Sequence, residues 1–356
     1  MRLLTQSTHE AKPESDREAE TLPDAAFYCV SSGMFFLGAV ALINSLRLLG
    51  HTEPVFVLDC GLSPAQREAL SAEATVVPAP GDSTPFLLKT PAPLRHPARV
   101  MVLIDADIIL TQSLAELIER AAEDRVIAVE HGEDRFFPEW GELLGGTARY
   151  RRYVSSSLVL LGGQPGSKVV RIMDQVQRQV ELERTPYSGP VPDFAFLGGT
   201  FPETDPHHPF YFADQDVLNA VLATRVDAER VELLDRRAEA LTPFTGLELI
   251  EPDTLRCAYE DGTEPYAVHH YLPTKPWLKR TYDGVYSRLL RRLLSEADVA
   301  LRVPRSWIPL RLKTGPIAHA SRKLINARER FRWRVEEPLT TWTQSLRRAA
   351  REGWSR

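Results

Sequence analysis

The sequence predicts an α/β fold in which a mostly parallel sheet lies between layers of helices. Apolar runs of strand length alternate along the chain with segments of helical periodicity. The strand-length runs are apolar at nearly every position, which is typical of parallel strands buried on both faces. The 356 residues, of which 43% are hydrophobic and 26% are charged, provide enough apolar side chains for a large core.

The first half of the chain repeats the order strand, helix, strand. Residues 26–32 and 54–60 are predicted strands, and residues 36–50 between them have helical periodicity. Ser63 and Gln66 form a capping box with Pro64 at the first helical position, which predicts that a helix begins there. A predicted strand at residues 75–80 and a strongly apolar segment at residues 98–110 follow, and Ser113 and Glu116 suggest a second capping box.

The second half adds further strands and helices around one long loop. The predicted strands are residues 126–130, 153–163 and 266–272, and the predicted helices begin near residues 167 and 214. The segment from Pro186 to Phe212 is rich in proline and aromatic residues. A loop of that length inside a compact domain is often functional, so we expect it to form the wall of an acceptor site.

Charge is distributed unevenly along the chain. Residues 279–356 contain 19 basic and 7 acidic residues, whereas the rest contains 24 basic and 41 acidic residues. A nucleic-acid binder is expected to carry its positive charge on the folded domain, so the pattern argues against nucleic acid as a partner. The basic segment instead suggests contact with an anionic surface. Residues 1–23 are polar and are predicted to form a disordered leader.

Neither cysteine usage nor hydropathy points to an exported or membrane-spanning protein. Cys29, Cys60 and Cys257 include no C-x-x-C pair, so we predict neither a disulfide framework nor a thiolate zinc site, and a cytoplasmic location. The 22 uncharged residues from Ala25 to Leu46 are interrupted by Ser31-Ser32-Gly33. We interpret them as a strand followed by a helix rather than as a membrane span.

Asp105 and Asp107 lie where a buried strand within the apolar segment of residues 98–110 ends. Residues two apart on a strand point to the same face, so both carboxylates are expected at one spot on the carboxyl edge of the sheet, where open α/β folds bind ligands. Two carboxylates suit Mg²⁺ or Mn²⁺ bound to a diphosphate. The alternative is a pair of solvated carboxylates at the end of a strand.

Two later segments carry further candidate groups. A neutral imidazole from His269 can complete the coordination of a metal held by two carboxylates, and Lys275 can neutralise phosphate charge. Asp214, Gln215 and Asp216 open a predicted helix, where acids usually act as caps and dipole partners. Together they could instead bind the hydroxyls of a sugar. The alternative to a metal-binding role for His269 is a structural role as a side chain at the end of a strand.

Taken in order, these motifs resemble glycosyltransferase family 8, the glycogenin-like group that includes bacterial lipopolysaccharide galactosyl- and glucosyltransferases. The resemblance runs from about residue 26 to residue 277. The segments that carry it are Leu58-Asp59-Cys60-Gly61-Leu62-Ser63, Leu103-Ile104-Asp105-Ala106-Asp107, Asp214 to Asn219, and His269 to Trp277, which match the family patterns LDxGIS, LYLDxD, DQDxLN and HxxGxxKPW.

The resemblance implies a GT-A fold over residues 24–280, with residues 281–356 as a basic, aromatic helical extension. It also implies a retaining transfer of glucose or galactose from a UDP-sugar. Asp105, Asp107 and His269 would hold Mn²⁺ or Mg²⁺. The donor would contact Ser32, Phe35, Lys89, Ser156 and Lys275, with Lys275 at the departing UDP and Phe35 on the uracil. Asp214, Gln215 and Asp216 would lie at the transferred sugar.

The sequence also departs from the family pattern. The family's NAG or NSG is replaced by Ser155-Ser156-Ser157, and the glycine of HxxGxxKPW is replaced by Leu272. Two other functions therefore remain open, a sugar-phosphate nucleotidyltransferase and a non-catalytic sugar-nucleotide-binding assembly protein. For the transferase, the acceptor is expected to be a cell-envelope glycan or glycolipid, with the basic extension on the inner face of the plasma membrane. The alternative for that extension is a helical cap packed on the catalytic domain.

Overall fold

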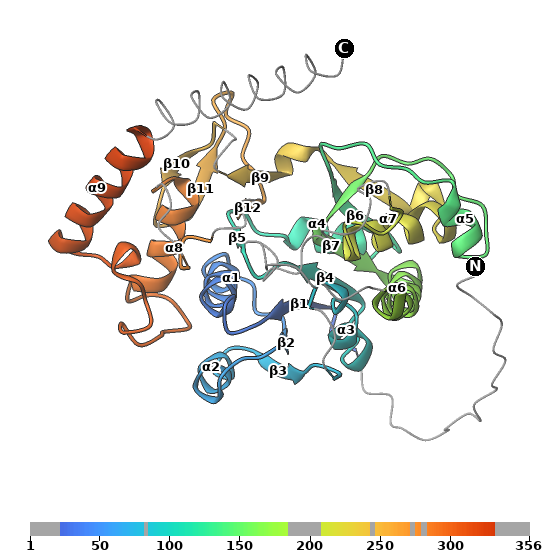
Figure 1. Ribbon diagram of the computed structural model, residues 1–356, viewed down its shortest axis with the longest axis horizontal. Helices are drawn as coiled ribbons and strands as arrows, with labels where there is room; N and C mark the ends of the chain where they lie inside the picture. Colours follow the sequence, from blue (N-terminus) through green and yellow to red (C-terminus); the bar gives the residue numbers. More distant parts are fainter. Residues whose placement is uncertain are drawn as a thin grey trace, which may run out of the picture.

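The computed structural model describes residues 22–81, 85–183, 208–242, 246–270, 275–278 and 283–331. Within these ranges, seven strands form a central sheet (Figure 1). Their order across the sheet is β3 (Thr75–Pro78), β2 (Val55–Asp59), β1 (Ala25–Ser31), β4 (Val100–Ile104), β7 (Val154–Gly162), β6 (Val126–Glu130) and β8 (Val231–Leu234). All neighbouring pairs are parallel except those that β7 makes with β4 and β6. The predicted mostly parallel sheet is therefore confirmed.

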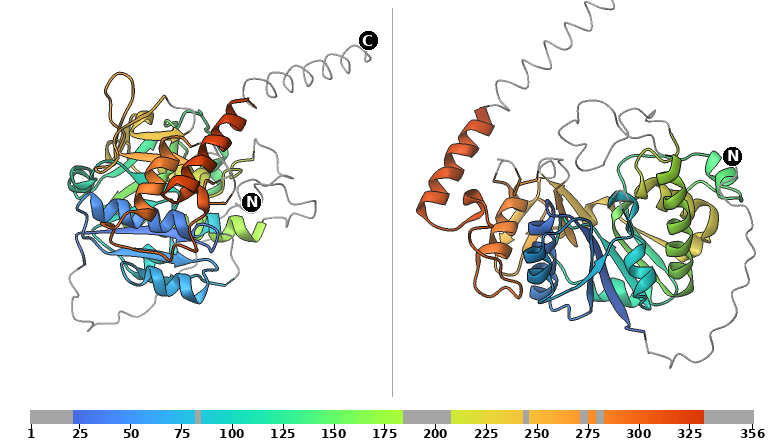
Figure 2. Two further views of the ribbon diagram at one scale, coloured as in Figure 1. Left: turned by 90° about the vertical axis from the view of Figure 1, so that its left-hand side faces the viewer. Right: turned by 60° about the horizontal axis from the view of Figure 1, so that its bottom comes forward.

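Helices cover both faces of this sheet (Figures 1 and 2). Side chains alternate along each strand, so Phe27 and Cys29 of β1 face one apolar core while Ala26 and Tyr28 face the other. The first core includes α1 (Phe36–Leu48), α4 (Ala115–Ala121) and α8 (Val285–Ser295). The second includes α3 (Pro91–Arg95), α6 (Gly163–Glu183) and α7 (Asp214–Arg225). The remaining α-helices in the described ranges are α2 (Pro64–Leu70), α5 (Glu139–Leu143) and α9 (Pro316–Phe331).

A smaller sheet adjoins the carboxyl end of β4. Among the described residues it has the order β5 (Ile108–Leu110), β12 (Ala267–His270) and β9 (Glu239–Thr242). β12 is antiparallel to β5 and parallel to β9. β10 (Glu248–Glu251) and β11 (Arg256–Ala258) form an antiparallel pair. Short 3₁₀ turns occur at Pro85–Leu87, Ala228–Arg230, Arg236–Ala238 and Leu310–Leu312.

One predicted capping box is confirmed and the other is wrong. The Gln66 backbone N–H donates to Ser63 Oγ at 3.3 Å, and the Ser63 N–H donates to Gln66 Oε1 at 2.9 Å, as predicted for the start of α2. The hydroxyl of Ser113 instead accepts from the N–H of Ala115 and lies 3.3 Å from a ring nitrogen of His51. Leu114 is the residue that precedes α4, and it has no capping side chain.

The first part of the basic extension packs on the main body of the molecule. Asn44 of α1 donates to the carbonyl oxygens of Leu293 and Leu301 and accepts from the N–H of Leu301, at 2.7 to 2.9 Å. The apolar face of α8 lies in the same core as α1. None of the helices in the described ranges is long and apolar enough to cross a membrane. Residues 1–21 and 332–356, which include most of the predicted leader and the end of the extension, lie outside the described residues.

Candidate active site

The Asp105-Ala106-Asp107 segment is a turn that connects the two sheets. β4 ends at Ile104 and β5 begins at Ile108, whose N–H donates to the carbonyl of Asp105 at 3.1 Å. We expected a buried strand to end at this segment, as it does, but we also expected both carboxylates on one face of a strand, and that expectation is wrong because the two residues lie in a turn. Because a turn separates the two residues, each carboxylate meets different partners.

Asp107 lies between a lysine and a histidine. Its Oδ2 is 2.7 Å from Lys275 Nζ and its Oδ1 is 3.4 Å from His269 Nε2. The strand register explains the second contact, because His269 on β12 is opposite Ile108, the residue that follows Asp107. Burial alone would raise the pKa of Asp107, but Lys275 and His269 outweigh it and hold the pKa well below its usual value. Asp107 is therefore ionised.

His269 is held from its other side by Glu239. Nδ1 of His269 lies 2.7 Å from Glu239 Oε1, and Ser157 donates its hydroxyl to Glu239 Oε2 at 2.6 Å. Burial alone would lower the pKa of His269, but Asp107 and Glu239 raise it to about 10. Burial would likewise raise the pKa of Glu239, but His269 and Ser157 keep it below its usual value. Each group thus favours the charged form of the other.

Asp105 belongs to a second ion-paired group. Lys89 Nζ lies 2.8 Å from Asp105 Oδ1 and 2.7 Å from Asp214 Oδ2, and it donates to the carbonyl and hydroxyl oxygens of Ser156. Burial raises the pKa of Asp105 to about 6 against the lowering effect of Lys89. Burial alone would lower the pKa of Lys89, but the two carboxylates raise it. Lys89 therefore connects the Asp105 turn, α7 and β7.

The start of α7 is fixed against β7 by Asn219. The N–H of Val154 donates to Asn219 Oδ1, and Asn219 Nδ2 donates to the carbonyl of Val154, both at 2.9 Å. One turn earlier, Gln215 Oε1 accepts from the N–H of Ser156 at 3.3 Å. These contacts place Asp214 and Gln215 beside the Ser155-Ser156-Ser157 segment, so α7 contributes to the same edge of the sheet as Asp105.

Asp216 points into a different environment. Its carboxylate accepts from Arg135 through Nε at 3.2 Å and through a terminal nitrogen at 3.0 Å, from Tyr153 Oη at 2.6 Å and from the N–H of Phe212 at 2.7 Å. The guanidinium of Arg135 also lies over the ring of Phe212. The side chain of Asp216 is 0% exposed, and burial raises its pKa although Arg135 and Tyr153 favour the ionised form. All its described contacts are with protein groups.

Ser32 and Phe35 lie at the amino end of α1. The N–H of Phe35 donates to the carbonyl of Ser32 at 2.9 Å, and the Phe35 ring packs edge-on against Trp277 with centroids 6.2 Å apart. Trp277 Nε1 donates to the carbonyl of Met34 at 2.6 Å. The Lys275-Pro276-Trp277 segment is thereby fixed against α1, and Phe35 reaches the site through Trp277 rather than by contact with the carboxylates.

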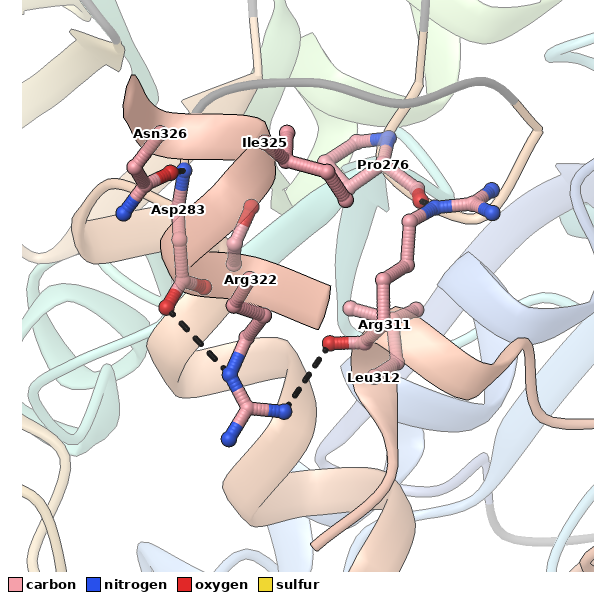
Figure 3. A pocket seen from close by; sticks show the side chains of 8 residues that line it. Pro276, Asp283, Arg311, Leu312, Arg322, Ile325 and Asn326 are labelled. Carbon is pink, nitrogen blue, oxygen red and sulfur yellow. Dashed lines mark hydrogen bonds and ion pairs between the residues drawn. The ribbon is translucent and has the colours of Figure 1, made fainter. Parts of the chain in front are cut away.

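The basic extension also supports this segment (Figure 3). Arg311 Nε donates to the carbonyl of Pro276 at 2.6 Å. Arg322 of α9 donates to the carbonyl of Arg311 at 3.3 Å, and its Nε is 3.6 Å from Asp283 Oδ2. Because Pro276 follows Lys275, this chain of contacts helps to position the lysine that pairs with Asp107.

The structure thus brings most of the predicted residues together. They form two groups of polar contacts, one made by Asp107, His269 and Lys275 and the other by Lys89, Asp105, Asp214, Ser156 and Gln215. Asp216, Ser32 and Phe35 contact these two groups only through neighbouring residues. Most of the predicted acceptor loop (residues 186–207 of the segment from Pro186 to Phe212) and Leu272 lie outside the described residues.

The side chains predicted to hold the metal, two carboxylates and an imidazole, are of types that bind a divalent cation. Asp107 and His269 face each other, and the second ring nitrogen of His269 lies against a carboxylate, which is the usual surrounding of a metal-bound histidine. Among the described residues, no group of three or more His, Cys, Asp or Glu side chains is arranged to hold a metal ion. Asp105 and Asp107 are instead paired with Lys89 and Lys275.

Two residues of the site were missed in the sequence. Glu239 and Arg135 belong to none of the recognised motifs. A signal for Glu239 existed, because it is an acid at the start of a short, otherwise uncharged run, Glu239-Ala-Leu-Thr, that proved to be a buried strand. Arg135 lies in a polar connecting segment and had no comparable signal.

No protein-family model matches the chain, and no curated protein sequence matches it. Several solved structures have a similar fold. The galactosyltransferase LgtC, in complex with donor and acceptor sugar analogs, has 14% identity and a TM-score of 0.46, over 79% of this chain and 98% of that chain. The bifunctional glycosyltransferase WbbM has 15% identity and a TM-score of 0.46, over 80% and 51% of the two chains. The glycosyltransferase GlyE of Streptococcus pneumoniae TIGR4 has 12% identity and a TM-score of 0.36, over 60% and 45%.

All three are glycosyltransferases, the class of enzyme that the sequence motifs resemble. At TM-scores below 0.5, this likeness does not establish what the chain does. The charged side chains at the junction of the two sheets give the evidence on function.

Proposed function

We propose that the protein is a retaining, metal-dependent glycosyltransferase that moves glucose or galactose from a UDP-sugar to a cell-envelope glycan or glycolipid. The observation that carries the proposal is the convergence of charged groups from separate parts of the chain. Asp105, Asp107, His269, Lys89 and Lys275 meet where the two sheets join, at the carboxyl end of β4. A diphosphate with its cation needs both acidic and basic groups at one place.

Asp105, Asp107 and His269 would hold Mn²⁺ or Mg²⁺, which would neutralise charge on the departing UDP. Lys275 and Lys89 pair with Asp107 and Asp105. With the two carboxylates on a cation, both ammonium groups would be available to other anionic groups. Lys275 would then bind the leaving phosphate, and Lys89 would remain beside Asp214 and Ser156, where it would contact the donor.

Donor recognition would be divided between two ends of the site. Ser32 and Phe35 would contact the nucleoside, with the Phe35 ring on the uracil. Ser156, Asp214 and Gln215 would contact hydroxyls of the sugar. They lie close together, because Gln215 and Lys89 both bond to Ser156. Asp216, which is enclosed by protein groups, would shape the start of α7 rather than touch the sugar.

The extension would place the enzyme on an anionic membrane from the cytoplasmic side. Ile317 and Leu324 are seven residues apart on α9 and are each 74% exposed. Lys323 and Arg328 lie on the same helix and are also exposed. Apolar side chains with basic neighbours are typical of helices that bind the surface of anionic bilayers. This position would suit a lipid-linked acceptor on the inner face of the plasma membrane.

The proposal is tested by calorimetric titration with UDP, UDP-glucose and UDP-galactose, with and without Mn²⁺. We expect metal-dependent binding that is lost in Asp105→Asn and kept in Asp227→Asn, a control at an exposed aspartate outside the site. Release of UDP from the bound donor would establish turnover. Absence of binding for all three nucleotides in the presence of Mn²⁺ would refute the proposed function.

A further inference from the structure

Glu239 is a buried carboxylate beside His269, on the side away from Asp107. It is 3% exposed, and both its oxygens have protein partners, Nδ1 of His269 at 2.7 Å and the hydroxyl of Ser157 at 2.6 Å. The hydroxyl of Ser157 is in turn 2.5 Å from that of Ser155. A line of hydrogen bonds therefore runs from β7 of the large sheet to β12 of the small sheet.

The strand register makes this contact specific. Glu239 on β9 is opposite Ala267, and His269 is two residues further along β12, so the two side chains are diagonal neighbours on one face. A carboxylate at Nδ1 fixes both the rotation of the imidazole and the position of its proton. As a result Nε2 is turned toward Asp107, 3.4 Å from Oδ1.

A buried ionised carboxylate is costly unless it is well paired, and hydrophobic residues would fill such a place at lower cost. Ser155 and Ser157 occupy the segment where the sequence departs from the family pattern, and both are buried. Their hydroxyls lie next to Glu239 rather than in open solvent. The arrangement therefore has a use that a packed apolar core would not provide.

We propose that Glu239 is a positioning residue that holds His269 with Nε2 directed at the metal site, and that Ser157 and Ser155 hold Glu239. The inference rests on the proposed function, because it assigns His269 to the cation. Glu239 does not touch the cation or the donor. Its effect is on the affinity for the metal, through the orientation and basicity of His269.

The test compares Mn²⁺ binding by electron paramagnetic resonance, in the presence of UDP, among the unchanged protein, Glu239→Gln and Ser157→Ala. Removal of such an outer partner typically costs about 10- to 100-fold in metal affinity, so we expect a loss in that range for Glu239→Gln. Ser157→Ala should lose less, roughly 10-fold or below, because Glu239 itself remains. Glu232→Gln is the matched control, since Glu232 is a strand glutamate that pairs with arginines instead.

A positioning role also predicts what is retained. The thermal midpoint should fall by only a few degrees in Ser157→Ala, because one hydrogen bond to Glu239 is lost. Saturating Mn²⁺ should restore kcat in Glu239→Gln. Unchanged Mn²⁺ affinity in both variants, with binding intact in the parent protein, would overturn the role of Glu239 alone. Failure of the parent protein to bind Mn²⁺ in the presence of UDP would overturn both this role and the proposed function. If Glu239→Gln does not fold, Ser157→Ala and Ser155→Ala decide the matter.

Discussion

The carboxylates of the Asp105 turn and the carboxylate of Asp216 differ in how they are held. The side chains of Asp105 and Asp107 are 32% and 10% exposed, and each has a lysine partner. Asp216 is 0% exposed and is bound by a forked guanidinium, a phenol and a backbone N–H. Lysine is a point charge on a flexible stem, whereas arginine bonds through a planar fork. We therefore expect the lysine pairs of Asp105 and Asp107 to open more readily than the enclosed contacts of Asp216.

The largest expected effect is a loss of activity when Asp105 is substituted. Asp105→Asn removes a charge that would bind the cation, and we expect kcat/KM to fall by about 10³-fold, equivalent to ~4 kcal/mol of transition-state stabilisation. The free energy of unfolding should change by less than ~1 kcal/mol, because Lys89 keeps Asp214 as a partner. Turnover and urea unfolding measured on one preparation check both statements. A variant that unfolds readily would show that Asp105 is structural.

Asp216→Asn should reduce stability and leave donor binding in place, the opposite of Asp105→Asn. The substitution leaves the guanidinium of Arg135, whose side chain is 13% exposed, facing a neutral amide. Breaking one side of a buried ion pair typically costs about 3 kcal/mol or more of stability. Urea unfolding should show this loss, while the folded variant retains metal-dependent UDP binding. Loss of UDP binding without loss of stability would place Asp216 in the donor site instead.

Gly38→Ala tests the spacing on which the turn depends. A Cβ at Gly38 would lie 2.4 Å from the carbonyl oxygen of Ala106 and 2.8 Å from the ring of Trp277. Overpacking of this kind typically costs about 1 to 3 kcal/mol, and we expect ~2 kcal/mol here. Donor affinity should fall as well, because the strain acts on the turn that carries Asp105 and Asp107. Gly132→Ala is the matched control, because a Cβ there would meet no atom within 4 Å and its φ is not in the left-handed region.

Tyr153→Phe should have the smallest effect. It removes one hydrogen bond to Asp216 and leaves Arg135 in place. A hydrogen bond to a charged group contributes about 1.5 kcal/mol, so a loss near that value is expected in urea unfolding. Activity should be unchanged if Asp216 only shapes α7. A large drop in kcat with normal stability would contradict the distinction drawn between the two groups.

Much of the fold was predictable because strongly apolar segments leave few alternatives. The strands around Phe27 and Val57 and the helix that begins at Pro64 were confirmed. The direction of β7 was beyond prediction, since periodicity does not tell a parallel from an antiparallel neighbour. The end of a buried strand at Asp105 was predicted, but the pairing of Ile108 to Leu110 in another sheet was not, because these residues continue the apolar run.

The candidate site was predictable only at residues that belong to the recognised motifs. Asp107, His269 and Lys275 were expected together and do meet. The partner of His269, Glu239, lies 30 residues before it, and their contact depends on the register of β9 and β12. The ion pair of Asp216 with Arg135 likewise joins residues 81 apart. Long-range pairings of this kind follow from tertiary packing and leave no local pattern.

The amide of Asn44 joins the basic extension to the first helix of the main body. One side chain on α1 satisfies backbone groups at Leu293 and Leu301, which lie more than 240 residues away. Because its partners are backbone groups, the amide constrains the path of the chain at these two positions and not the side chains there. Removal of the segment would leave the amide buried without these partners, whereas substitutions in α8 that keep the path would leave it satisfied.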